Sequence, residues 1–138
     1  MTEASKSRQV LEQLGPAARA ASRHAHAPFS GFHVGAALAT ENGTRFSACN
    51  VESASYGLTQ CAERNALGSA VAAGMKPGEA SSLVIYLAGD TPLPPCGACR
   101  QVMAELMQAD AIVVSFCDTS ATLSWTVQEL LPQAFLGR

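Results

Sequence analysis

Cys61-Ala62-Glu63 and, further along the chain, Pro95-Cys96-Gly97-Ala98-Cys99 bring three thiols and one carboxylate into a pattern typical of a metal site. A structural zinc site fills its four coordination positions with protein atoms, whereas a catalytic site keeps one position open for water. Three cysteines beside a glutamate that is not needed as a ligand therefore predict an open zinc site with its own proton carrier.

The spacing of these motifs also constrains the fold. Cys96 and Cys99 are three residues apart and share one face at the start of a helix. Cys61 lies 35 residues before Cys96, which leaves room for one helix and one strand. In a β–α–β unit both helices begin at the same edge of the sheet, and helix N-termini favour anions such as thiolates. Glu63 is two residues from Cys61, so the two can converge only in the first turn of a helix that begins at Cys61.

The chain before Cys61 predicts one helix and one β-hairpin. Apolar residues at helical spacing predict a helix over residues 3–23, which Gly15-Pro16 should kink or interrupt. Residues 34–38 and 45–49 read as two strands. Asn42-Gly43 between them is a strong hairpin signal, so the pair should be antiparallel. Residues 50–60 are expected to form a loop.

From Cys61 onward, helices and strands alternate. Helices are expected over residues 61–73 and 97–107, and strands over residues 83–88, 111–116 and 121–125. A capping box from Thr126 to Glu129 should open a last short helix. The alternation predicts parallel pairing after residue 50. The expected fold class is α/β, a single domain over residues 1–138 with a mixed five-stranded sheet and helices on both faces.

Composition excludes some classes of partner. The net charge is −2 and the lysines and arginines are scattered, which disfavours polymeric nucleic acid as a substrate. No apolar stretch reaches about 18 residues, so we expect no membrane span. The N-terminus lacks the apolar core of a signal peptide, and we therefore expect a cytoplasmic location. The five cysteines would stay reduced there.

Two other uses of the cysteines explain less of the pattern. A redox-active C-x-x-C pair, as in thioredoxin-like folds, would leave Cys61 and Glu63 without a role. A closed structural zinc site with Cys49 or Cys117 as fourth ligand would again leave Glu63 idle. We expect Cys49 and Cys117 to be small buried side chains instead.

Charge balance at the metal suggests a role for two arginines. Zn²⁺ with three thiolates carries a net charge of about −1, which should make its bound water less acidic than at a neutral-ligand site. Arg64 and Arg100 each follow a ligand motif directly. We expect at least one of them to donate hydrogen bonds to a ligand sulfur.

Motifs along nearly the whole chain, in order and at family spacing, resemble cytidine deaminase of the small homotetrameric type with three cysteine ligands. The glutamate and Pro-Cys-x-x-Cys pair is itself a known signature of zinc deaminases. The resemblance rests on these segments: residues 29–38 (FSGFHVGAAL), Asn50-Val51-Glu52, Tyr56, residues 61–64 (CAER), residues 95–101 (PCGACRQ) and residues 130–135 (LLPQAF). It implies a cytidine-deaminase-like three-layer α/β/α fold.

The resemblance implies roles at the chemical centre. Cys61, Cys96 and Cys99 match the ligands of one Zn²⁺ per chain, and Glu63 matches the proton shuttle.

For the substrate, the resemblance implies contacts to both the sugar and the base. Asn50 and Glu52 match the pair that holds the ribose 3′-hydroxyl, and Phe32 matches the aromatic residue beside the pyrimidine. Ala62 and Pro95 match backbone positions that contact the base. General chemistry agrees, because a carboxylate accepts from a sugar hydroxyl and an aromatic face suits a planar ring.

Assembly also follows from the resemblance. Tyr56 and Phe135 match aromatics that reach a neighbouring subunit's site, in a homotetramer. The sequence adds its own hint, because an aromatic residue near a frayed C-terminus is of little use to a monomer.

The implied reaction is zinc-dependent hydrolytic deamination of cytidine and 2′-deoxycytidine to uridine and 2′-deoxyuridine plus ammonia, a step of pyrimidine salvage. A deaminase of a cytosine-nucleoside antibiotic such as blasticidin S is the nearest alternative, since it shares the Cys-Ala-Glu and Pro-Cys-x-x-Cys motifs. Asn50-Val51-Glu52 and Tyr56 favour the ordinary nucleoside. A non-enzymatic zinc-binding module is a third possibility, against which Glu63 argues.

Overall fold

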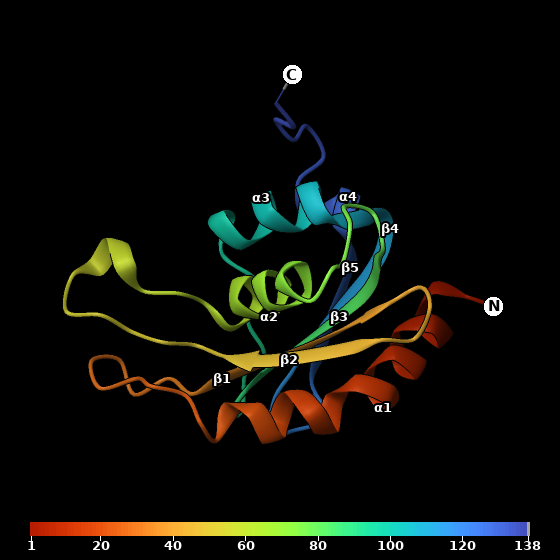
Figure 1. Ribbon diagram of the computed structural model, residues 1–138. Helices are drawn as coiled ribbons and strands as arrows, with labels where there is room; N and C mark the ends of the chain where they lie inside the picture. Colours follow the sequence, from red (N-terminus) through yellow and green to blue (C-terminus); the bar gives the residue numbers. More distant parts are fainter. Residues whose placement is uncertain (138) are drawn as a thin grey trace.

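A five-stranded sheet forms the middle layer of the computed structural model, which describes residues 1–137 (Figure 1). The spatial order of the strands is β2-β1-β3-β4-β5. Only β3 and β4 pair in parallel, and the other three pairs are antiparallel. The sheet is therefore mixed, as predicted. Its strands are β1 (Val34–Thr40), β2 (Arg45–Cys49), β3 (Ala80–Leu87), β4 (Met107–Phe116) and β5 (Thr122–Thr126).

Alternation along the strands divides the core between two helical layers. Val84 and Tyr86 of β3 pack toward α1 (Glu3–Ser22) on one face. Leu83 and Ile85 point to the other face, because successive strand residues alternate. That second face is covered by α2 (Ala62–Ala72), α3 (Gly97–Leu106) and α4 (Val127–Leu130). The three-layer α/β/α arrangement follows, with helices on both faces.

Helix α1 runs through Gly15-Pro16 as one helix, so the predicted interruption is not observed. Pro16 lacks an N–H and cannot bond the carbonyl of Glu12. Both residues are exposed, so water can replace the missing bond. Gly15, in contrast, is buried, and a Cβ there would come within 3.5 Å of Phe116 in β4. Packing against the sheet thus holds the helix together across the proline.

Gly35 sets the distance between α1 and β1. A Cβ on this residue would lie 1.8 Å from the carbonyl oxygen of Ala18, which is far inside van der Waals contact. Only glycine lets the helix backbone come this close to the strand.

Several boundaries differ from those expected. β3 begins at Ala80, and β4 begins at Met107 directly after α3, both earlier than the apolar runs predicted. A short 3₁₀ helix, η1 (Tyr56–Leu58), lies within the expected loop. β5 pairs antiparallel with β4, contrary to the parallel pairing predicted after residue 50. No helix separates these two strands, so the chain simply turns back.

The topology brings two helix N-termini to one edge of the sheet. β2 and β3 are both antiparallel to β1 and so point the same way. α2 follows β2 and α3 follows β3, so both helices begin at the edge where those strands end. In Figure 1 the loop that carries η1 protrudes at this end, while the N-terminus lies at the opposite end. Among the described helices, none has the length and apolarity needed to cross a membrane.

Candidate active site

Three cysteine sulfurs meet where α2 and α3 begin. Cys61 is the N-cap residue of α2, Cys96 is the N-cap residue of α3, and Cys99 lies in the first turn of α3. Their sulfur atoms all lie within 4.8 Å of one another, and 3.8 Å separates those of Cys61 and Cys96. Neither cap side chain bonds the helix backbone, so both sulfurs face the cluster. The three cysteines are positioned to bind one metal ion.

The remaining two cysteines lie outside this cluster. Cys117 is buried and Cys49 is half-buried, and neither joins the group of candidate ligands found within residues 1–137. A closed site with either residue as fourth ligand is thus not what the structure forms. Three protein ligands would leave one position of a zinc ion for water, which suits a catalytic rather than a structural site.

Glu63 lies in the first turn of α2, beside the thiols. Its side chain lines the cavity described below, yet the residue is only 5% exposed. Burial raises the pKa of this carboxyl, and negative charge on Cys61 raises it further. A pKa moved upward toward neutrality suits a group that must both take and give protons.

Arg64 donates a hydrogen bond to a ligand sulfur. Its Nη2 lies 3.4 Å from Sγ of Cys61. The neighbouring Cys99 thiol and then Arg64 lower the pKa of Cys61 to about 5. The Nε of Arg64 is also buried and has no partner among the described residues. Three soft sulfur donors with one guanidinium beside them fit Zn²⁺, since the arginine offsets the excess negative charge of a three-thiolate site.

Arg100 holds the backbone instead of a sulfur. Its Nε donates to the carbonyl oxygen of Pro95 at 2.8 Å, and its Nη1 donates to that of Leu130 at 3.2 Å. Of the two arginines that follow the ligand motifs, only Arg64 therefore reaches the thiols. Arg100 ties the turn before Cys96 to the end of α4.

A cavity of about 410 Å³ opens beside the thiols. One part of its wall is apolar and comes from Ile85, Leu87 and Leu93. The site residues expected from the sequence that also line it are Phe32, Asn50, Glu52, Cys61, Ala62, Glu63 and Cys96. Pro95 is buried and does not line the cavity, whereas Pro94 beside it does.

Asn50 is already engaged with the backbone of the cavity wall. Its Oδ1 accepts from the N–H of Val34 at 2.9 Å, and its Nδ2 donates to the carbonyl of Phe32 at 2.8 Å. An amide has two donor hydrogens and two acceptor lone pairs, so each end keeps capacity for one more bond. Asn50 thus fixes the segment that carries Phe32 and still faces the cavity.

Glu52 is held by a neighbouring loop. Its Oε1 accepts from the N–H groups of Phe29 and Ser30 at 2.9 and 3.1 Å, and its Oε2 accepts from the Ser30 hydroxyl. The Ser30 hydroxyl is the main reason that the pKa of Glu52 is lowered. Ser30 Oγ also accepts from the N–H of Phe32 at 3.0 Å. Sequence reasoning missed Ser30, because a serine in a turn carries no signal of its own.

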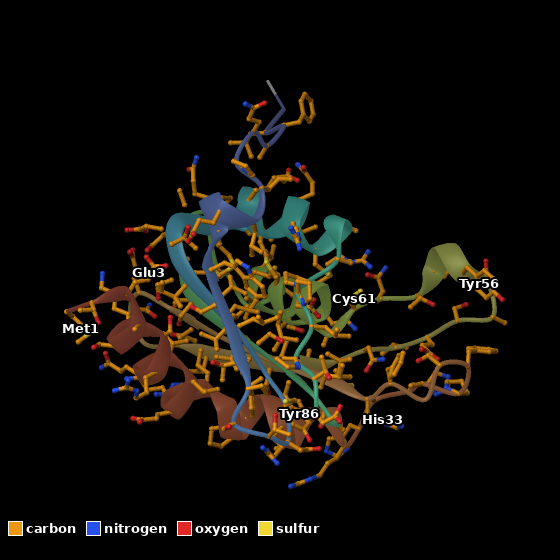
Figure 2. The ribbon with its side chains drawn as sticks, turned by 180° about the vertical axis from the view of Figure 1, so that it is seen from behind. Met1, Glu3, His33, Tyr56, Cys61 and Tyr86 are labelled. Atoms are coloured by element: carbon orange, nitrogen blue, oxygen red, sulfur yellow. The ribbon has the colours of Figure 1, made fainter. Side chains whose placement is uncertain are left out.

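Tyr56 and Phe135 contribute nothing to this chain's own cavity. They are 88% and 72% exposed, respectively. Figure 2 shows Tyr56 at the tip of a protruding loop, away from Cys61. The C-terminal segment that carries Phe135 also projects from the body (Figure 1), and the Phe135 carbonyl accepts from Gln101 Nε2 at 2.6 Å.

Residues 8–115 match the family model described as the cytidine and deoxycytidylate deaminase zinc-binding region. The chain belongs to this deaminase family. A cytidine deaminase of Halalkalibacterium halodurans is 48% identical over 113 residues, which cover 80% of this chain and 83% of that protein. The crystal structure of cytidine deaminase from Burkholderia pseudomallei superposes with a TM-score of 0.84 at 46% identity, covering 98% of this chain and all of that chain (100%).

An antibiotic deaminase is a more distant relative. Blasticidin-S deaminase of Bacillus cereus is 30% identical over 106 residues, which cover 72% of this chain and 74% of that protein. As a member of the deaminase family, this chain is a zinc-dependent hydrolytic deaminase, and Cys61, Cys96 and Cys99 are placed to hold its metal ion.

Proposed function

We propose that this chain deaminates cytidine and 2′-deoxycytidine to uridine and 2′-deoxyuridine and releases ammonia. The observation that carries the proposal is Glu63, a buried carboxyl that faces the cavity beside three thiols and is not one of the candidate ligands. A zinc-binding module without catalysis has no use for such a group. The more similar relatives described above are both cytidine deaminases.

Glu63 moves two protons in this reaction. Zinc, when bound, supplies a Lewis acid that makes water acidic enough to react at neutral pH. Glu63 accepts a proton from the attacking water and passes it to N3 of the pyrimidine, while the water oxygen bonds to C4. It then carries the second proton to the amino group, the C4–N bond breaks, and ammonia leaves. The raised pKa of Glu63 suits both the uptake and the release.

The cavity favours a nucleoside over a nucleotide. Within residues 1–137, no lysine or arginine lines it, while the carboxyl groups of Glu52 and Glu63 do. A 5′-phosphate would meet negative charge without a compensating cation from the part of the chain that the structure describes. Glu52 and Asn50 can instead bond a sugar hydroxyl with their remaining capacity. Phe32, 60% exposed, offers its ring face to the base.

Two further contributions belong to the same proposal. Arg64 offsets the negative charge of three thiolates, which keeps the metal an effective Lewis acid. The backbone of Ala62 contacts the base from the cavity wall. Pro95 has its carbonyl taken by Arg100, so its part is to place Cys96.

We further propose a homotetramer in which Tyr56 and Phe135 enter a partner's cavity. Both aromatics are exposed on projecting segments, which supports an intermolecular role. The physiological setting proposed is pyrimidine salvage in the cytoplasm, where free thiols are stable.

A substrate panel tests the proposal. Zinc-loaded protein is mixed separately with cytidine, 2′-deoxycytidine, cytosine, deoxycytidylate and blasticidin S, and the loss of ultraviolet absorbance is followed. The two nucleosides should react fastest, while cytosine and deoxycytidylate should be poor substrates. Preference for blasticidin S would favour the antibiotic deaminase, and no turnover at full zinc occupancy would favour the non-enzymatic module.

A further inference from the structure

Residues 89–96 lie between β3 and α3 and build part of the site. Leu93 and Pro94 of this segment line the cavity, and Cys96 ends it as a candidate metal ligand. Where this segment lies therefore decides both the shape of one cavity wall and the position of one sulfur. We refer to residues 89–96 as the β3–α3 connection.

Gly89 is the first residue of the connection. Both of its backbone polar groups form hydrogen bonds with Asp118, which follows β4. The N–H of Gly89 donates to Oδ2 of Asp118 at 2.9 Å. The N–H of Asp118 donates in return to the carbonyl of Gly89 at 2.9 Å. Gly89 has a φ of 118°, a left-handed conformation that turns the chain away from the strand. The neighbouring Thr119 hydroxyl adds a weaker bond to the Asp90 carbonyl at 3.3 Å.

Asp118 is itself fixed from the far side of the sheet. Its Oδ1 accepts from the Tyr86 hydroxyl at 2.5 Å and from Nη1 of Arg19 at 3.2 Å. The guanidinium of Arg19, on α1, also lies 4.7 Å from the centre of the Tyr86 ring. Tyr86 is 5% exposed and packs on the α1 face, opposite the metal cluster. The bond from Tyr86 is also the main reason that the pKa of Asp118 is lowered, so the carboxylate form persists.

The other end of the connection is tied by Arg100 through the Pro95 carbonyl. Among the described residues, no hydrogen bond joins residues 91–94 to another part of the chain. The cavity-facing middle of the connection thus depends on how its two ends are held. At the other end, Asp118 makes both hydrogen bonds to Gly89. The bond that its carboxylate accepts from the Gly89 N–H is stronger than a bond between neutral groups.

We propose that Asp118 is a positioning residue for the active site: it fixes Gly89 so that Leu93 and Pro94 form the cavity wall and Cys96 meets the other two thiols. The effect on the cavity wall rests on the proposed nucleoside deaminase function. The effect on the metal rests only on the thiol cluster.

Zinc release gives a test that needs no substrate. Zinc-loaded protein is mixed with excess chromogenic chelator, and the rate of zinc transfer is recorded for wild type, Asp118→Ala and the control Asp110→Ala. Asp110 is an exposed aspartate of β4 that does not line the cavity. Residues that orient metal ligands typically change metal affinity 10–100-fold. Because Asp118 acts through the backbone, we expect release roughly tenfold faster in Asp118→Ala and unchanged in Asp110→Ala.

Steady-state kinetics test the cavity wall. Asp118→Ala should raise KM for cytidine more than it lowers kcat per bound zinc, because Glu63 on α2 is not attached to the connection. Tyr86→Phe removes one bond to Asp118 and keeps both bonds to Gly89, so it should change KM and zinc release in the same direction by about threefold or less. Should wild type fail to turn over cytidine, the zinc-release result still decides the role of Asp118.

A purely structural role gives a different outcome. Asp118→Ala would then lower the thermal unfolding midpoint while zinc release and KM both stay within twofold of wild type, and this result overturns the proposal. If Asp118→Ala does not fold, Asp118→Asn serves the same comparison, since its single carbonyl oxygen can satisfy Gly89 or Tyr86 but not both at full strength. Unchanged zinc release and KM in Asp118→Asn would equally overturn it.

Discussion

Glu63 is the residue whose loss should separate catalysis from metal binding. Glu63→Gln keeps the shape of the side chain but cannot carry protons. General acid–base groups contribute about 10²–10⁴-fold, and Glu63 serves two transfers, so kcat should fall by at least that range. Zinc content measured by elemental analysis should stay near one per chain, because the ligands are the three cysteines. Activity within tenfold of wild type would remove Glu63 from the mechanism.

Ser30 links the residue proposed to bind the sugar to the one proposed to lie beside the base. Ser30→Ala removes the hydroxyl that donates to Glu52 and accepts from the N–H of Phe32. We expect KM for cytidine to rise roughly tenfold, as for the loss of a hydrogen bond to a charged group. Zinc content and turnover per bound zinc should change much less. Equal KM values for Ser30→Ala and wild type would show that Glu52 needs no such support.

The effect of Ser30→Ala on stability should depend on pH, in a direction fixed by the lowered pKa of Glu52. The pKa of Glu52 is lowered in the folded chain, so its bonds contribute stability above its ordinary pKa of 4.5, and that stability is lost as pH falls through the lower folded value. The difference in thermal unfolding midpoint between wild type and Ser30→Ala should thus shrink as the pH is lowered below 4.5. A difference that stays constant into that range would mean that the Glu52 charge plays no part.

At the residue scale, the sequence predicts the residues that carry the chemistry better than the residues that hold them in place. The spacing of Cys61, Cys96 and Cys99 was enough to predict a metal cluster, because helix starts offer few arrangements for three sulfurs. Ser30 and Asp118 gave no signal, since their roles depend on contacts 22 and 29 residues distant in sequence. Position in the motif predicted that at least one of Arg64 and Arg100 bonds a ligand sulfur but did not say which; Arg64 does so, and Arg100 bonds the Pro95 carbonyl instead.

At the scale of elements, the close contact between α1 and β1 depends on the absence of a Cβ at Gly35. Gly35→Ala would place a Cβ 1.8 Å from the Ala18 carbonyl oxygen, so helix and strand must separate. We expect a loss of about 3 kcal/mol or more and a fall of roughly 10 °C in the thermal unfolding midpoint.

Gly68→Ala is the matched control in α2. It has no neighbour within 4 Å of the added Cβ. In a helix interior this change should stabilise by up to about 1 kcal/mol. If both variants unfold at the wild-type temperature, the close approach of α1 to β1 is not needed for stability.

Most elements were predicted from apolar periodicity and turn residues, and the errors have a common cause. The extra residues at the starts of β3 and β4 are partly polar, such as Ser81 and Gln108, and give no apolar run. They become strand because neighbouring strands offer hydrogen bonds. Likewise, α1 continues past Pro16 because the sheet beneath it supplies packing. Tertiary contacts thus decided what local signals left open.

At the scale of the whole molecule, the exposed aromatics predict that the site is shared between subunits. Deleting residues 135–138 removes Phe135, which is 72% exposed and lies outside its own chain's cavity. Activity should fall at least tenfold if Phe135 enters a partner's site, as truncating an aromatic anchor in an interface typically costs 2 kcal/mol or more. Zinc content should hold. Light scattering should give a tetramer for the full chain, and a fully active monomer would show that each site is complete alone.

The opposite placement of the N-terminus and the η1 loop has a practical consequence. Met1 is 82% exposed, and Figure 2 shows it at the end of the molecule away from Tyr56. An affinity tag or a surface attachment at Met1 should leave the cavity mouth accessible to nucleoside. The same attachment after residue 137 would crowd Phe135. Immobilised preparations of this deaminase should accordingly be coupled through the start of α1.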